Sequence, residues 1–407
     1  MERQTSDGAA LDGLRVLDLS TVLAAPVCAT LLGDFGADVI KVEQPGRGDS
    51  MRWLSGSPGG RSVPWVQEAR NKRSVTLDLR RSEAHGPLHR LLAECDAVVT
   101  NFRPPTLERW DIAPETLLER HPHLVVGVIT GYGLTGPYRD RGAFDRIAAA
   151  FSGHTHATGH PDGPPVRSGY SMIDYMTAYL AAFAMVTALY HRDVNGGCGQ
   201  IVDLALYEAA ARATESSVAV HALTGEIRER NGNRNPVMVP ADDFVASDGT
   251  RVSIHAGTPP LLARLCSTMG NPGLVDDPRF ADRSDLLANQ DALYDEIAAW
   301  VRSRPGREVV ELLADCDVPA ALVMNAADIA DDPHYRARET YTVVDDPDFG
   351  PMPVVGPLPK LSGTPGSIRR DAPRLGEHDD EIWTELAGLT DEELRSLRAQ
   401  GVIGDVR

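Results

Sequence analysis

The stretch Gly169–Glu208 holds the longest apolar segment of the chain and constrains its fold most strongly. Ser171 and Asp174 match a helix-start pattern, in which a Ser caps the first backbone N–H groups and an acid three residues later reaches back to the cap. The residues that follow are apolar on nearly every side of the predicted helix, which is typical of a buried helix. Gly196 and Gly197 end this helix, and a short β-rich run follows.

Asp174 therefore lies at the start of a buried helix, where two roles are open to it. A capping acid is the common outcome of a Ser-x-x-Asp pattern. A nucleophile is the alternative, because a carboxylate can attack a carbonyl group once it is ionised, positioned and stripped of water. The helix dipole favours the ionised form at this end, and buried surroundings exclude water. The spacing permits the nucleophile without choosing it.

The length and charge of the chain limit its class. With 407 residues it is too long for one ordinary hydrophobic core, so we expect two domains. Its 40 basic and 58 acidic residues give a net charge of −18. This balance argues against a nucleic-acid partner, which requires a basic footprint. A polyanionic small molecule remains compatible with it, because a local basic pocket can form in an acidic protein.

The cysteines and apolar segments bear on the compartment. The cysteines are scattered, odd in number and without metal-ligand spacing, as is typical of reduced thiols in a cytosolic protein; they are Cys28, Cys95, Cys198, Cys266 and Cys316. The first residues, MERQTSDGAALDG, contain no apolar signal core. The longest apolar run, Ala178–Tyr190, is too short to span a bilayer. We therefore predict a cytoplasmic protein with no membrane partner.

The N-terminal half alternates between predicted strands and helices. The strands are Leu14–Leu19, Asp38–Glu43, Val75–Leu79, Ala97–Thr100 and Leu124–Ile129, and the intervening helices are Pro26–Phe35, Ser82–Cys95 and Pro105–Arg120. Such alternation predicts an α/β domain with a Rossmann-like parallel sheet covered by helices. Ligands bind at the carboxyl ends of the strands in sheets of this kind.

The loops at these strand ends are the expected ligand-binding segments. They are Ser20–Leu23, the tract after Glu43, Asn101–Pro104 and Gly131–Gly133. No G-x-G-x-x-G follows the first strand, so we do not expect NAD. The nearby cations either converge on phosphate groups or are separate surface charges; they are Lys72, Arg73, Arg80, Arg103 and Arg109.

Six segments resemble the class III CoA-transferases, a family that includes formyl-CoA:oxalate and carnitine CoA-transferases and the 2-methylacyl-CoA racemases. They are LDGLRVLDLS, GADVIKVEQPGRGDSMR, NKRSVTLDL, NFRPPTLERW, GPPVRSG and GCGQIVDLALYEA. The resemblance covers nearly the full chain and implies that Asp174 is the catalytic nucleophile. It also implies CoA contacts at Leu23, Ala24, Leu77, Arg80, Asn101, Phe102, Arg103, Arg109 and Asp145.

Phe144 and Asp145 separate two branches of this family. Its racemases carry a His-Asp pair at this place, and the His transfers a proton. Phe144 cannot do so, and epimerisation requires an acid and a base on opposite faces of the α-carbon. The resemblance therefore favours a transferase. Asp145 has a second possible role, as the cap of the helix that follows it.

Three histidines lie close together in the segment HTHATGH; they are His154, His156 and His160. Histidine is a common metal ligand, but no carboxylate or cysteine lies at ligand spacing from this cluster. We expect structural or solvent-facing histidines and predict no metal site.

The rest of the chain predicts a smaller α/β domain. A hairpin is expected at 243–256, turned by Asp248-Gly249, with helices at Pro259–Met269, Asp291–Val301 and Gly306–Ala314. We assign residues 1–224 to the first part of a large CoA-binding domain, 225–330 to the small domain and 331–407 to a return segment. The resemblance implies that this segment, which includes the strand-like Thr342–Pro359 and two terminal helices, completes the large domain. It also implies an interlocked homodimer.

The activity implied by the resemblance is transfer of coenzyme A from an acyl-CoA donor to a small carboxylic acid. It would proceed through an aspartyl anhydride and an aspartyl-CoA thioester on Asp174, with acyl-CoA as substrate and no permanently bound metal or redox cofactor. Short dicarboxylates such as succinate are the expected donor acids. The alternatives are a racemase, a non-catalytic CoA-binding partner subunit, which would be expected to lack Asp174, and a nucleotide-dependent oxidoreductase, which the missing glycine fingerprint disfavours.

Overall fold

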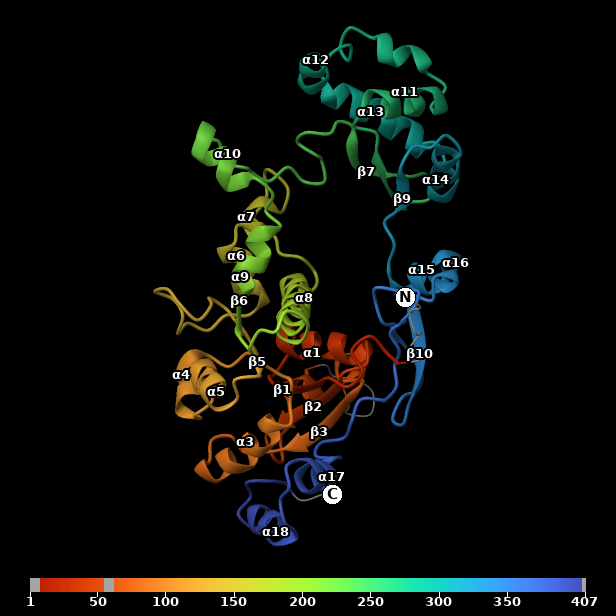
Figure 1. Ribbon diagram of the computed structural model, residues 1–407. Helices are drawn as coiled ribbons and strands as arrows, with labels where there is room; N and C mark the ends of the chain where they lie inside the picture. The colour runs from red at the N-terminus through yellow and green to blue at the C-terminus, as the bar shows by residue number, and fades with distance from the viewer. Residues whose placement is uncertain (1–7, 55–61, 405–407) are drawn as a thin grey trace, which may run out of the picture. The chain divides into compact units, whose positions relative to one another are not determined.

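The computed structural model describes residues 8–54 and 62–404 (Figure 1). It forms two compact units, which are described separately. The larger unit comprises Met1–His154, Ser168–Glu215 and Arg338–Arg407, and the smaller comprises Thr155–Arg167 and Ser216–Ala337. Whether they are independently folding domains with the boundaries 1–224, 225–330 and 331–407 stays a prediction.

The larger unit is built on a six-stranded parallel sheet with the strand order β3-β2-β1-β4-β5-β6. The strands are β1 (Arg15–Leu19), β2 (Asp38–Glu43), β3 (Lys72–Thr76), β4 (Ala97–Thr100), β5 (Val125–Thr130) and β6 (Ile201–Ala205). Every neighbouring pair is parallel. This order is that of a doubly wound sheet, in which the winding direction reverses between β1 and β4. The predicted Rossmann-like α/β fold is confirmed.

Helices cover both faces of the sheet, as a parallel sheet requires. Side chains alternate along β1, so that Leu17 joins one core and Val16 the other. On the Val16 side lie α1 (Ala24–Asp34) and α8 (Met172–Val194), which pack together above the sheet in Figure 1. On the Leu17 side lie α3 (His85–Ala93), α4 (Pro104–Arg109), α5 (Pro114–Arg120) and the C-terminal tail.

The helix α8 is the predicted apolar helix, and it is longer than the apolar run alone indicated. Its 23 residues extend from Met172 to Val194, and among residues 8–54 and 62–404 it is the one helix whose length and composition would suffice to cross a membrane. One face is nonetheless buried against α1 and β5, where Met185 lies over Gly127. A Cβ at Gly127 would come within 2.6 Å of the Met185 sulfur, so α8 packs closely on the sheet. The opposite face carries exposed apolar side chains, so the predicted burial on nearly every side of this helix is wrong for the single chain.

Two predicted elements differ from the structure. The third strand is Lys72–Thr76 rather than Val75–Leu79, because the chain after Thr76 leaves the sheet and the Asp78 N–H donates to the Val402 carbonyl at 2.8 Å. The predicted helix Pro105–Arg120 is two helices, α4 and α5. They are separated at Asp111, which has a φ of 58°, in the left-handed region that cannot continue a helix.

The C-terminal tail returns to the larger unit, as predicted. A hairpin of β10 (Tyr341–Asp346) and β11 (Gly350–Val355) precedes α17 (Asp379–Glu381), the turn η4 (Ile382–Leu386) and α18 (Asp391–Ala399). Thr76 at the end of β3 donates its N–H and its hydroxyl to Asp379, each at 2.6 Å. Trp383 is fully buried against the strands and donates its indole N–H to Asp379.

The smaller unit has its own core around an antiparallel sheet of β7 (Ala241–Val245), β8 (Arg251–His255) and β9 (Ala320–Leu322). The first two strands form the predicted hairpin, with Gly249 at a φ of 83° in the turn. Its helices are α10 (Ser217–Thr224), α11 (Pro259–Thr268), α12 (Arg283–Ala288), α13 (Gln290–Arg302), α14 (Gly306–Asp315), α15 (Ala326–Asp331) and α16 (Pro333–Ala337), with a turn η3 (Pro272–Asp276).

The remaining helical segments join these elements. They are η1 (Ser50–Trp53), α2 (Val63–Glu68), η2 (Ser82–Ala84), α6 (Asp145–Phe151), α7 (His154–Ala157) and α9 (Leu206–Arg212).

Replacement of Trp383 tests whether the tail is part of the large core. Trp383→Ala removes a fully buried aromatic side chain, and we expect the free energy of unfolding to fall by about 3–5 kcal/mol. Denaturant unfolding followed by far-UV circular dichroism measures this loss. The exposed Glu385→Ala two residues away is the control, and equal midpoints for the two variants would contradict the packing role.

Candidate functional site

The point where the sheet reverses its winding holds a cavity of about 570 Å³. Loops from the carboxyl ends of β1, β4 and β5 form its walls, and the start of α8 closes one side. The lining residues most relevant to chemistry are Thr21, Val22, Leu23, Ala24, Asn101, Phe102, Arg103, Gly131, Arg141, Phe144 and Asp174. Open α/β sheets bind their ligands at this position.

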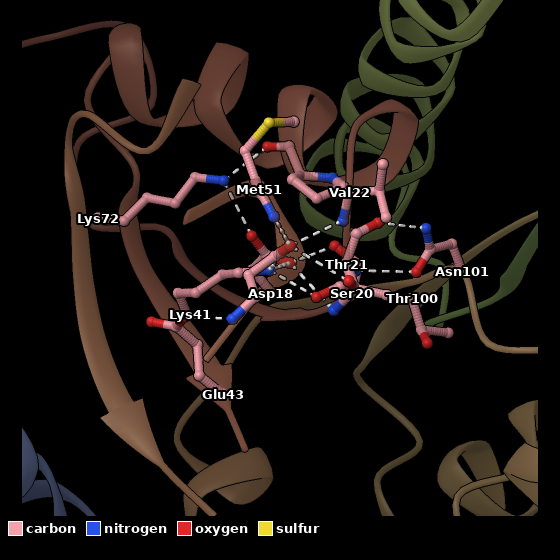
Figure 2. Close-up of polar contacts among 12 residues, drawn as sticks. Asp18, Ser20, Thr21, Val22, Lys41, Glu43, Met51, Lys72, Thr100 and Asn101 are labelled. Carbon is pink, nitrogen blue, oxygen red and sulfur yellow. Dashed lines mark hydrogen bonds and ion pairs between the residues drawn. The ribbon is translucent and has the colours of Figure 1, made fainter. Parts of the chain in front are cut away.

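A buried network of charges links β1, β2 and β3 (Figure 2). Asp18 at the end of β1 receives the ammonium groups of two buried lysines, Lys41 from β2 at 3.4 Å and Lys72 from β3 at 2.9 Å. Burial alone would raise the pKa of Asp18, but the two lysines outweigh it and hold this pKa below its usual value. Lys41 also lies 2.9 Å from Asp49, which extends the network to the next loop.

The loop after β1 is shaped by hydrogen bonds from two neighbouring loops. Asp49 accepts the N–H of Val22 at 3.0 Å and the hydroxyl of Thr21 at 3.2 Å. The side chain of Asn101, after β4, accepts the Thr21 N–H at 3.0 Å and donates to the Thr21 carbonyl at 2.7 Å. Val22 has a φ of 70°, which is strained for a β-branched residue. These bonds hold the strained loop against the cavity.

Asp174 lies in the first turn of α8, and its side chain lines the cavity. Ser171 occupies the cap position but makes no side-chain capping bond, so the predicted Ser cap is wrong. Asp145, at the start of α6, supplies the cap instead. Its carboxylate accepts the N–H of Ile173 at 2.8 Å and that of Asp174 at 3.3 Å. A distant residue therefore orders the turn that carries Asp174.

The surroundings of Asp174 favour its neutral form. Only 9% of Asp174 is exposed, and no Lys or Arg among residues 8–54 and 62–404 forms an ion pair with it. Burial, followed by the negative charge of Asp145, raises the pKa of Asp174 to about 7. We expected the helix dipole to keep this acid ionised, but burial and the second carboxylate outweigh the dipole. Asp174 is thus near half-ionised at neutral pH.

The predicted CoA contacts fall into two neighbouring cavities. Leu23, Ala24, Asn101, Phe102 and Arg103 line the cavity of Asp174. Leu77 and Arg80 line a second cavity, of about 280 Å³, which shares Phe102, Thr21 and Ser50 with the first. Arg109 lines neither cavity and donates to the Thr106 hydroxyl at 3.4 Å. Asp145 also lines neither and contacts the backbone of α8. Their roles toward CoA stay predictions.

The basic residues do not gather as one anion site. Lys72 is buried in its ion pair with Asp18, and Arg73 pairs with Asp38 and with Glu381 in the tail. Arg80 reaches the second cavity, but its guanidinium makes two hydrogen bonds of 2.7 Å with Asp78. Of the two possibilities that the sequence left open, these contacts favour separate charges over convergence on one phosphate site.

The predicted histidine cluster makes ordinary polar contacts. The His154 ring lies 3.0 Å from the Ala210 carbonyl oxygen, and His156 lies 3.3 Å from the Glu229 carboxylate. Over the part of the chain that the structure describes, no group of three or more His, Cys, Asp or Glu side chains is arranged to hold a metal ion.

The sequence analysis placed Gly131 in a ligand-binding loop but gave no role to Arg141. Gly131 approaches Ala143 so closely that a Cβ on it would lie 2.4 Å from the Ala143 Cβ, which brings the segment 141–144 over the cavity. That segment places Arg141 on the wall. A glycine after a strand was the signal for Gly131, whereas nothing in the sequence distinguished Arg141 from other surface arginines.

Fold and cavity together define a doubly wound α/β protein with a cavity at the switch point of its sheet and a buried carboxyl group in the cavity wall. The family model of CoA-transferase family III matches residues 11–379. The succinyl-CoA–D-citramalate CoA-transferase of Chloroflexus aurantiacus is 41% identical over 97% of this chain and 98% of its own. The succinyl-CoA:mesaconate CoA-transferase of Haloarcula hispanica is 39% identical over 92% and 96%. A CAIB/BAIF family protein from Brucella suis superimposes with a TM-score of 0.82 at 30% identity, covering 93% of this chain and 100% of that one.

The chain therefore belongs to CoA-transferase family III, and it is a CoA-transferase. The predicted family is confirmed. CoA thioesters and small carboxylic acids are the substrates on which its relatives act.

The raised pKa of Asp174 predicts a pH-dependent stability. Because the folded state binds this proton more tightly than the unfolded chain, the contribution to stability is complete below about pH 4 and is lost as pH rises through about 7. Asp174→Asn cannot lose a proton. We expect its stability relative to wild type to increase by about 1–3 kcal/mol between pH 5 and pH 8, measured by denaturant unfolding.

Asp145→Asn is the matched control, because it removes the second negative charge and keeps a capping oxygen. The pKa of Asp174 should fall in this variant, and the change in stability between pH 5 and pH 8 should be smaller than in wild type. A constant stability difference between wild type and Asp174→Asn at both pH values would contradict a raised pKa.

Proposed function

We propose that this chain transfers coenzyme A from a dicarboxylic acyl-CoA donor to a small carboxylic acid acceptor, with Asp174 as the covalent nucleophile. The observation that carries the proposal is the position of Asp174, buried and without a cation partner among the described residues, on the wall of the cavity at the switch point of the sheet. The relatives that act on succinyl-CoA support a dicarboxylic donor.

In this proposal the reaction takes four steps on one carboxylate. Asp174 attacks the thioester carbonyl, forming an acyl-aspartyl anhydride and releasing CoA thiolate. The thiolate attacks the Asp174 carbonyl of the anhydride, giving an aspartyl-CoA thioester and the free donor acid. The acceptor carboxylate then attacks this thioester, forming a second anhydride and releasing the thiolate. Attack of the thiolate on the acceptor carbonyl yields the new acyl-CoA and restores Asp174. No metal or redox cofactor takes part.

The surroundings of Asp174 suit this role. An ion pair with Lys or Arg would stabilise the carboxylate and weaken it as a nucleophile, and the described residues supply none. Burial removes solvating water, which favours attack once the proton has left. Because the pKa of Asp174 is about 7, a large fraction of the enzyme carries the reactive anion at neutral pH.

The two neighbouring cavities offer a path for the CoA chain. In this proposal the nucleotide occupies the cavity of Leu77 and Arg80, and the pantetheine arm passes Phe102 toward Asp174. Leu23 and Ala24 lie where α1 begins, and the first N–H groups of a helix lack intrahelical partners. We assign to them the stabilisation of the oxyanions.

Epimerisation is not proposed. Phe144 lines the same cavity as Asp174 and cannot transfer a proton, so the second acid–base group that a racemase needs is missing at this place.

The decisive variant is Asp174→Asn. Asparagine keeps the size of the side chain but cannot form the anhydride, so transfer should fall by several orders of magnitude while CoA affinity stays near that of wild type. Asp193→Asn, an exposed acid at the other end of α8, is the matched control and should remain active. Transfer is read by mass spectrometry of the CoA esters, and CoA affinity by calorimetry.

A second experiment, on the wild-type enzyme, should trap the covalent intermediate. Wild-type enzyme held with succinyl-CoA and treated with hydroxylamine should be modified at Asp174 and at no other acid. An Asp174→Asn enzyme that retains activity, once deamidation back to Asp has been ruled out by mass, would refute the nucleophile and leave Asp174 as a structural residue.

We also propose that the protein is an interlocked homodimer. The face of α8 that points away from the sheet carries exposed apolar side chains at helical spacing, namely Met172, Tyr179, Leu180, Phe183, Val186, Tyr190 and Val194. Phe183 is 69% exposed, which is unusual for a large apolar side chain in the middle of a long helix. A second copy of the chain would cover this stripe.

The free cysteines are consistent with a cytoplasmic location, which we propose as well.

Phe183→Asp tests the dimer. Light scattering of wild type should give twice the chain mass of 43.9 kDa, and the charged variant should shift toward a single chain because it places a carboxylate in an apolar contact. Unchanged far-UV circular dichroism would show that the variant is folded. A wild-type particle of one chain at micromolar concentration would rule the dimer out.

A further inference from the structure

Arg141 is a cation on the wall of the reaction cavity for which the proposed mechanism has no use. It lines the same cavity as Asp174 and follows the close approach of Gly131 to Ala143. Over residues 8–54 and 62–404 its side chain makes no ion pair and no hydrogen bond. Arg141 is exposed, so in a protein with 58 acidic and 40 basic residues its guanidinium is a positive group without a carboxylate partner that is accessible to an anion in the cavity.

The neighbouring cations have more of their donors in use than Arg141 has. Arg139, two residues earlier, pairs with Glu108 at 3.0 Å and with Asp140 at 3.3 Å. Arg103, on the opposite loop, donates to the Asp140 carbonyl at 3.3 Å. Of these three arginines, Arg141 is the one whose donors are all available within the cavity wall.

Arg141 is also held in a defined place. The guanidinium of Arg141 lies 3.8 Å from the centre of the Tyr138 ring. The backbone N–H of Arg141 donates to the Tyr138 carbonyl at 2.9 Å. Tyr138 in turn packs edge-on against Tyr132 and Phe151, with ring centres 5.8 and 6.0 Å apart. Stacking on an aromatic ring fixes the plane of the guanidinium while its edge stays free to donate.

We propose that Arg141 binds the distal carboxylate of a short dicarboxylic acyl group while Asp174 reacts with the carbonyl at its other end. The inference rests on the proposed function and assigns its substrate class to a residue. A planar guanidinium pairs with a carboxylate through two parallel hydrogen bonds, which gives both strength and direction. In the proposed function the nucleotide of CoA occupies the second cavity, which Arg47 and the Asp78-paired Arg80 line, so its phosphates do not require Arg141.

The test uses isotope exchange, which needs only one acid at a time. Enzyme, succinyl-CoA and ¹³C-labelled succinate exchange label without any other acceptor, and butyryl-CoA with labelled butyrate is the comparison of equal carbon number that lacks the distal carboxylate. Wild type should exchange succinate with a kcat/KM at least about 10-fold above that for butyrate, since hydrogen bonds to charged groups contribute about 1.5–3 kcal/mol.

Arg141→Gln should lower succinate exchange by about 10–100-fold and leave butyrate exchange within about threefold of wild type. Arg141→Lys, which keeps the charge but loses the paired donors, should fall between them. Arg139→Gln, whose side chain is engaged with Glu108 and does not line the cavity, should behave as wild type.

The outcomes separate the two proposals. The assignment of Arg141 would be overturned if Arg141→Gln lost exchange equally for both esters. It would also be overturned if wild type exchanged both acids equally. Either result would count even if Asp174 is acylated and trapped by hydroxylamine. Failure of both esters to acylate Asp174 in the wild-type enzyme would instead overturn the proposed function, and with it this inference.

Discussion

The geometry of the site depends on two buried lysines that share one carboxylate. Lys41 and Lys72 come from β2 and β3, and both point at Asp18 at the end of β1. Burying three charges is costly unless each is paired, and here each one is. The network joins three neighbouring strands and, through Asp49, the loop that carries Val22. Ion pairs as well as apolar packing therefore hold the cavity wall in place.

A second carboxylate, Asp145, controls both the position and the pKa of Asp174, the acid that we propose as the nucleophile. Asp145 orders the first turn of α8 through backbone hydrogen bonds, and its charge works against ionisation of Asp174. The same contact therefore positions the acid and makes its anion less stable. Such opposition between stability and reactivity is common at active sites, where an unstrained and fully paired acid would be inert.

Much of the fold follows from local patterns, whereas the site depends on contacts between distant residues. The strands β1, β2, β4 and β5 and the helix α8 were predicted because their apolar periodicity is strong. The third strand was misplaced because Lys72 reads as a surface residue until its partner Asp18, 54 positions away, is known. The cap of α8 was assigned to Ser171 because Asp145, which accepts the Ile173 N–H, lies 28 residues before Ile173. Asp174 itself was found by family resemblance, since its spacing alone fits a cap equally well.

The return of the tail to β3 affects how the chain folds during its synthesis. Thr76 finds its partner Asp379 only 303 residues later, so a ribosome has made most of the chain before the edge strand is complete. Until then the apolar surface around Leu88 and Leu91 lacks the cover that Trp383 and Ile403 provide. The nascent chain must therefore carry an open sheet edge and an uncovered core through most of its synthesis. A chain that ends before Trp383 lacks the residues that complete this core.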